Sequence, residues 1–231
     1  MALAEQPLRA AVDAARRASD AELEADAQIA LGGVLSAMGR HDEAFEALDV
    51  ARRIGSPPLQ ERATLQRAVV CRDVRRLDES LALFDGALPA VRAPGRELDL
   101  ARVQANRGGI LLFQGDPTAA IPPLEESARL LAEFGHEFVR LQVLHDLGCA
   151  VAHTGDLPRA LDLFDEASAG MAALGHDASL PLLSRAEVLL RAGLSSDARE
   201  AAADAVRRLD AEGNGYATAQ ALVALAEASR L

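Results

Sequence analysis

The sequence predicts an all-α protein, a solenoid of antiparallel helix pairs, and three observations support this fold class. Half of the 231 residues are hydrophobic but only 3% are aromatic, which favours helices over strands. A motif of small and large apolar residues recurs along nearly the whole chain. Glycines separate its copies at regular intervals, as they do where helices end.

The recurring motif is clearest when residues 30–55 are compared with residues 146–175. Both segments read Leu-Gly, an apolar residue, Gly, Ala, a large apolar residue and Ala at matching offsets. A repeat of this length predicts a helix pair, in which a first helix (helix A) packs on a second (helix B). The steps between copies are 36, 40, 40 and 38 residues, counted between the anchors Ala44, Ser80, Ala120, Ala160 and Ala198.

The helices follow one another with short links and without a low-complexity linker. Five full repeats are expected in one solenoid over residues 1–231, at about 21–55, 58–95, 97–135, 137–175 and 179–213. A lone helix B precedes them and a lone helix A follows them. We expect no strands, and helices at about 5–19, 21–38, 42–54, 58–74, 78–92, 97–114, 117–134, 137–154, 157–174, 179–192, 195–212 and 215–230.

Small and polar residues at fixed places in each repeat have physical reasons. Glycine in helix A lets the two helix backbones approach closely, at Gly32, Gly108 and Gly148. A residue of positive φ ends helix A, at Gly39, Gly115, Gly155 and Gly193, with Arg75 standing at this turn in the second repeat. N-cap candidates for helix B are Asp42, Asp78, Asp116, Asp156 and Ser195, and Pro117 suits a first helical position. Each helix B is expected to end at a glycine, at Gly55, Gly95, Gly135, Gly175 and Gly213.

Charge and cysteine usage exclude several classes of function. The formal net charge of -11 disfavours nucleic acid and an anionic membrane surface as partners, because both require clustered Lys and Arg. The two cysteines form no CxxC motif and predict no disulfide framework. No signal peptide and no run of 18 apolar residues is present, so we expect a cytoplasmic protein.

The five motif copies resemble the tetratricopeptide repeat (TPR), a helix pair with small residues where helices A and B cross. The resemblance covers nearly the whole chain and implies a right-handed superhelix. The early Trp of the usual repeat and the Pro that ends it are absent, and steps of 36–40 residues exceed the usual length. Longer helices and links are the expected consequence.

Three phrases are similar to the N-terminal TPR regions of actinobacterial CHAT proteins: NRGGILLFQGD (106–116), LHDLGCAVAHTGDLPRALDLFDEA (144–167) and LLSRAEVLLRAGLSSDAREAA (182–202). In that family a caspase-like peptidase domain follows the repeats. The resemblance implies a sensor or adaptor region that regulates a protease. It implies no catalytic residue in this chain, since no strand pattern for a peptidase domain exists here.

The TPR frame assigns helix A positions 2, 5, 9, 12 and 13 to a concave groove. This groove is mixed, with apolar patches beside several arginines, and it lacks the Lys/Asn carboxylate clamp of chaperone-binding repeats. Its arginines favour an acidic or C-terminal peptide, or else pair with carboxylates within the stack. The candidate partner-binding residues are Arg62, Arg72, Asp73, Arg102, Phe113, Gln142, His145, Cys149, His153, Glu187 and Arg191.

Within this set, His145, Cys149 and His153 recur every four residues and raise three alternatives. A shared metal ion is disfavoured, because the two histidines lie about 12 Å apart along a helix. A Cys–His nucleophile is disfavoured, because no oxyanion-hole loop and no orienting carboxylate is evident, although Asp146 is adjacent on another face. The alternative we favour is that all three line the groove and contact a partner or solvent.

Two further residue types have structural interpretations. Arg67, Arg107 and Arg185 share frame position 7, so we expect their stems to pack between helices and their heads to meet a carboxylate or a helix end. Cys71 at position 11 is expected to be a small core residue.

The function that these observations favour is a non-catalytic protein-interaction scaffold whose groove binds a partner peptide or helix. The alternative is a regulatory region of a larger CHAT-type peptidase or bacterial regulator. We expect no cofactor and no metal. The Ala- and Leu-rich end helices indicate either a piece of a longer protein or self-association through these ends.

Overall fold

The computed structural model describes residues 2–211 and 215–229, and within them every regular element is an α-helix. The predicted all-α helical-repeat fold is therefore confirmed. The helices are α1 (Ala2–Ala18), α2 (Ala21–Ala37), α3 (His41–Ile54), α4 (Pro57–Asp73), α5 (Leu77–Val91), α6 (Glu97–Phe113), α7 (Pro117–Glu133), α8 (Glu137–Thr154), α9 (Leu157–Ala173), α10 (Ser179–Arg191), α11 (Ser195–Ala211) and α12 (Gly215–Ala228).

The helix boundaries agree with the predicted ones to within three residues, the largest difference being the start of α1. Gly213, expected to end a helix B, lies outside the described residues. The agreement arises because Gly and Pro at the links leave little freedom in where a helix can begin or end.

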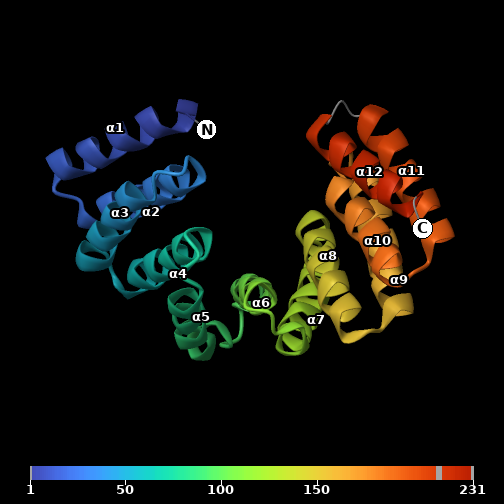
Figure 1. Ribbon diagram of the computed structural model, residues 1–231. Helices are drawn as coiled ribbons and strands as arrows, with labels where there is room; N and C mark the ends of the chain where they lie inside the picture. The colour runs from blue at the N-terminus through green and yellow to red at the C-terminus, as the bar shows by residue number, and fades with distance from the viewer. Residues whose placement is uncertain (1, 212–214, 230–231) are drawn as a thin grey trace. The chain divides into compact units, whose positions relative to one another are not determined.

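The chain forms two compact units, Met1–Ile110 and Leu111–Leu231. In the first unit, α1 packs on α2, α2 on α3, α3 on α4 and α4 on α5 (Figure 1). In the second, the helices from α7 to α12 pack in the same consecutive order. Alternate helices also touch, as α2 with α4, α8 with α10 and α10 with α12. Helices A thus stack on one another as well as on their own helices B.

The crossing of helices A and B depends on glycine. A Cβ on Gly32 would lie 2.8 Å from Cγ of Leu48, and a Cβ on Gly148 would lie 2.7 Å from Cε1 of Phe164. Leu48 and Phe164 are completely buried. Each of these two glycines therefore leaves the space that the large residue of helix B fills, and at Gly32 a Cβ would also lie 3.4 Å from the backbone oxygen of Ala44.

A left-handed residue ends each helix A in the five repeats. Its φ is between 73° and 92° at the four predicted glycines and 64° at Arg75. The residue after it immediately precedes the first helical residue of helix B, and this residue therefore holds the N-cap position. Asp116 and Asp156 occupy that place and accept hydrogen bonds from the N–H groups of Ala119 and Arg159.

The prediction of N-caps at Asp42 and Asp78 is wrong. The cap positions are held by Arg40 and Arg76, which make no side-chain capping bond. Both aspartates lie inside the first turn, where a carboxylate still interacts favourably with the helix dipole. Ser195 is likewise the first helical residue of α11 and not its cap. Pro117 does begin α7, as predicted.

We predict that Gly32→Ala lowers the free energy of unfolding by about 1–2 kcal/mol, because overpacking against Leu48 exceeds the gain in helix propensity. The control is Gly86→Ala in α5, where a Cβ would meet nothing within 4 Å. That change should stabilise by up to about 1 kcal/mol. Urea unfolding of both variants measures the difference, and equal effects would refute the close-approach explanation.

We predict that Arg75→Gly raises stability by about 0.5–1 kcal/mol, because a non-glycine residue of left-handed conformation is strained. Arg75→Ala is the matched control. It removes the same side-chain interaction but keeps the Cβ, so it should give no gain. Thermal unfolding followed by circular dichroism compares the stability of the native chain with that of the two variants. An Arg75→Ala variant as stable as Arg75→Gly would contradict the prediction.

Candidate binding groove

The first unit contains a hollow of about 660 Å³ between α2, α4, α5 and α6. Its apolar lining comes from Ile29, Leu65, Val69, Phe84 and Val103. Three of these, Ile29, Leu65 and Val69, occupy groove positions of the TPR frame. The hollow therefore coincides with the surface for which the sequence predicts partner binding.

Arginines surround this hollow, and most of them are already paired. Arg62 lies 2.7 Å from Asp26 of α2, and Arg96 lies 2.7 Å from Glu61 and 2.8 Å from Asp99. The exposed Arg102 makes no ion pair with any residue that the structure describes. Of the two predicted groove arginines at the hollow, Arg62 is neutralised internally and Arg102 is available to a ligand.

Arg72 and Asp73, also predicted to bind a partner, belong to a network that links three helices A. The Arg72 guanidinium donates to Asn106 Oδ1 at 2.6 Å and to Asp73 Oδ1 at 2.9 Å. The hydroxyl of Ser36 donates to Asp73 Oδ2 at 3.2 Å. These contacts join α2, α4 and α6 and hold the groove surface together.

The predicted groove positions of the repeat do not include position 6, whose residues also make contacts in the structure. The residues there are polar in four consecutive repeats: Gln66, Asn106, Asp146 and Ser184. Asn106 accepts from Arg72 of the preceding repeat, and Ser184 contacts His145 of the preceding repeat. The recurrence of a polar residue beside the helix crossing was the signal in the sequence that could have found them.

In the second unit, His145 lies within a polar cluster formed by α8 and α10. Its Nε2 is 3.0 Å from Ser184 Oγ and 3.7 Å from Cys149 Sγ. Its Nδ1 is 3.3 Å from Asp146 Oδ1. The expectation that no carboxylate orients this histidine is therefore wrong, because the carboxylate of Asp146, although on another face of the helix, reaches the ring of the adjacent residue.

The environment of His145 shifts its protonation equilibrium. Burial disfavours the charged ring and lowers its pKa, but the hydrogen bonds with Asp146 and with the Cys149 sulfur have the larger combined effect. The pKa of His145 is therefore raised above its ordinary value of 6.5. The side chain is only 15% exposed, so solvent screens these interactions weakly.

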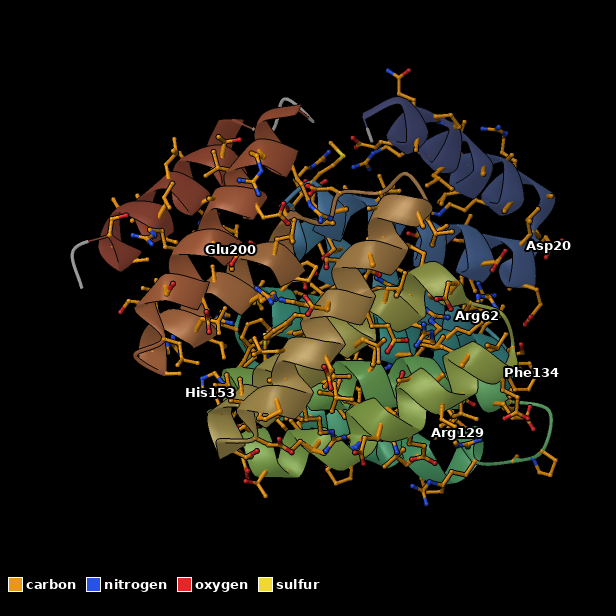
Figure 2. All side chains as sticks on the ribbon, turned by 90° about the vertical axis from the view of Figure 1, so that its right-hand side faces the viewer. Asp20, Arg62, Arg129, Phe134, His153 and Glu200 are labelled. Atoms are coloured by element: carbon orange, nitrogen blue, oxygen red, sulfur yellow. The ribbon has the colours of Figure 1, made fainter. Side chains whose placement is uncertain are left out.

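The other predicted groove residues of this unit do not join the cluster. His153, labelled in Figure 2, is exposed, and its Nδ1 lies 2.7 Å from the carbonyl oxygen of Cys149. Gln142, Glu187 and Arg191 are also exposed. No three His, Cys, Asp or Glu side chains in the described part of the chain are placed to hold one metal ion.

Phe113, predicted as a groove residue at the end of α6, is 58% exposed. On α12, Leu222 and Val223 are 50% and 58% exposed. The apolar outer side expected of this last helix is therefore present, and self-association through it stays a prediction.

The position 7 arginines form the same contact three times. Arg67 lies 3.0 Å from Asp49, Arg107 lies 2.7 Å from Asp85 and Arg185 lies 2.8 Å from Asp165. Each pair joins helix A to the helix B that precedes it, so the predicted structural role is confirmed. In the fourth repeat, where Leu147 stands at position 7, the equivalent acid Glu125 pairs with Arg159.

Cys71 is a core residue, as predicted. It is completely buried, and burial raises the pKa of its thiol to about 11.

Comparison with known proteins agrees with this architecture. Residues 60–133 match the model of the family described as tetratricopeptide repeat. BtubC (BKLC) from P. vanneervenii is similar in structure, with a TM-score of 0.74 and 20% identity over 91% of each chain. A STAND ATPase with a TPR sensor from Pyrococcus horikoshii matches with a TM-score of 0.78 and 14% identity. The alignment with that ATPase covers 87% of this chain and 32% of the other.

YrrB, named as a TPR protein with an unusual peptide-binding site, is 18% identical with a TM-score of 0.60. That alignment covers 91% of this chain and 97% of YrrB. No curated protein matches the sequence.

These findings define a protein with a tetratricopeptide-repeat fold. The segment that matches the family model runs from α4 to α7, whereas the structural likeness extends over most of the chain. No described helix is both long enough and apolar enough to cross a membrane.

We predict that Arg72 and Asn106 couple by about 1 kcal/mol in a double-mutant cycle of Arg72→Met and Asn106→Ala, because a partly buried charge-assisted hydrogen bond joins two repeats. The exposed pair Arg129 and Glu133 within α7 is the control and should couple by less than about 0.5 kcal/mol. Equal coupling in the two cycles, measured by urea unfolding, would show that the network does not hold the repeats together.

Proposed function

We propose that this chain is a non-catalytic protein-interaction scaffold that binds a peptide or helix of a partner in the hollow of its first unit. The observation that carries the proposal is the 660 Å³ hollow, lined by apolar side chains and bordered by Arg102. Its volume suits a few side chains of an extended or helical segment.

The charges around the hollow favour an acidic partner segment. Three arginines and two acids, Glu61 and Asp99, line the hollow, so its formal net charge is positive, whereas the chain as a whole carries -11. Since Arg62 and Arg96 already pair internally, Arg102 supplies the cation for a carboxylate. Apolar side chains of the same segment would cover Leu65 and Val69.

The fold adds support of a general kind. Helical-repeat surfaces are extended, and YrrB, which shares this fold, is named for a peptide-binding site. The fold itself does not identify a ligand, so the proposal depends on the hollow and its charges.

A second candidate is a sensor or regulatory region within a larger regulator or CHAT-type peptidase. The similarity to a STAND ATPase with a TPR sensor favours it, because the alignment covers only 32% of that longer chain. Reading the gene on both sides of the codons for residues 1–231 tests it. A regulatory or peptidase domain on either side would support this candidate, and the absence of further coding sequence on both sides would contradict it.

We predict that the chain selects peptides with an acidic residue or a free C-terminal carboxylate next to apolar side chains, when it is presented with a peptide display library. Arg102→Glu should weaken a selected peptide by at least about tenfold, because it replaces attraction with repulsion. Fluorescence anisotropy of the labelled peptide measures the affinity.

The matched control is Arg53→Glu, since Arg53 is also exposed in the first unit but lies on α3, away from the hollow. It should change the affinity less than about twofold, as expected for a distant surface charge. Selection of no peptide, or equal losses in both variants, would contradict the proposal.

A further inference from the structure

We propose that Cys149 is an activated nucleophilic thiol that exchanges with small-molecule disulfides, with His145 as the base that takes its proton. The cluster of His145, Asp146, Cys149 and Ser184 lies in the second unit, so this inference does not depend on peptide binding by the first. The reaction is stoichiometric modification of the chain and not enzymatic turnover.

The geometry fixes which ring nitrogen faces the thiol. Asp146 Oδ1 lies 3.3 Å from Nδ1 of His145, and a carboxylate at that distance holds a proton on Nδ1. In the neutral ring Nε2 is then the unprotonated nitrogen, and it lies 3.7 Å from Cys149 Sγ. The carboxylate, imidazole and thiol thus follow the order that generates a nucleophile by proton transfer.

The environment favours the proton on the ring once it has moved. Asp146 and the Cys149 sulfur raise the pKa of His145 despite its burial. Ser184 Oγ lies 3.0 Å from Nε2 and 4.0 Å from Sγ, so its hydroxyl can accept from the ring and turn toward the sulfur. Both helices, α8 and α10, therefore contribute to the cluster.

Exposure separates the two cysteines of the chain. Cys149 is partly exposed on the face of helix A that the TPR frame assigns to the groove. Cys71 is completely buried, and its thiol has a pKa raised to about 11. The thiolate is the reactive form and the reagent must reach it, so Cys71 fails both conditions, whereas Cys149 is accessible and has a base beside it.

The chemical step balances without an additional oxidant. The proton of Cys149 moves to Nε2 of His145, and the thiolate attacks one sulfur of the disulfide. A new S–S bond to Sγ forms as the old one breaks, and the departing thiolate takes the proton from His145. Cys149 ends as a mixed disulfide, and one molecule of small thiol is released.

The test is the reaction of the native full chain with dithiodipyridine, an uncharged disulfide, at about pH 7. Release of the coloured thione gives the rate, and peptide mass spectrometry locates the modified cysteine. We expect one mixed disulfide, on Cys149, formed at least about tenfold faster than on the same cysteine in the denatured chain.

His145→Gln should slow this reaction at least about tenfold, since it removes the base. His136→Gln is the matched control, because it makes the same change at an exposed imidazole that precedes α8 and makes no side-chain capping bond. It should leave the rate unchanged. Should His145→Gln unfold by circular dichroism, Asp146→Asn replaces it as the milder variant and should slow the reaction several-fold.

Two results would overturn the proposal. One is a native Cys149 that reacts no faster than in the denatured chain. The other is a folded His145→Gln variant, or Asp146→Asn in its place, that reacts as fast as the His136→Gln control.

Discussion

The close crossing of helices A and B is the constraint on which the rest of the structure depends. At Gly32 and Gly148 the absence of a side chain lets the partner helix approach until Leu48 and Phe164 fill the gap. Once this spacing is set, the small residues that recur at the crossing, such as Ala44 and Ala160, are buried completely. A chain with only six Phe and no Trp can then bury a core through many small contacts instead of a few large ones.

The crossing brings helices together in pairs, and polar contacts then join the pairs. The position 7 arginines bind acids on the preceding helix B, as Arg107 binds Asp85. On the other side of helix A, the contact between Arg72 and Asn106 joins successive repeats. Arg107 is neutralised by an acid of the preceding repeat, whereas Arg72 is neutralised by Asp73 of its own helix and donates to a neutral amide of the next repeat. This explains why an arginine-containing groove presents little net positive charge.

A structural feature could be predicted from the sequence where its physical cause lies in the residue itself or its immediate neighbours. Helix ends were predictable, because Gly115 and Gly155 act through their own φ and Pro117 through its own missing N–H group. The caps at Asp42 and Asp78 were mispredicted, because the turn residue before them sets the first helical position.

Contacts between repeats could not be read from one repeat alone. The pairing of Arg62 with Asp26 and the contact of Ser184 with His145 depend on which residues face each other after stacking. The periodicity indicates that repeats stack, but it does not give the side-chain geometry across the junction. Hence the repeat frame pointed to Arg62 and Arg102, which line the hollow of the first unit, but it did not predict which residues they contact.

Helix A packs on helix B with one face and lines the groove with another. Unusual side chains can therefore occur on the groove face of one repeat without disturbing the fold. The packing face of helix A in the fourth repeat keeps Leu147 and Gly148, as the first repeat keeps Leu31 and Gly32. On the groove face, the place of Ile29, which is buried in the core of the first unit, is taken in the fourth repeat by His145. Asp146 comes from the same helix, but Ser184 comes from the next repeat. The polar cluster around Cys149 is therefore a product of stacking, since neither repeat contains it alone.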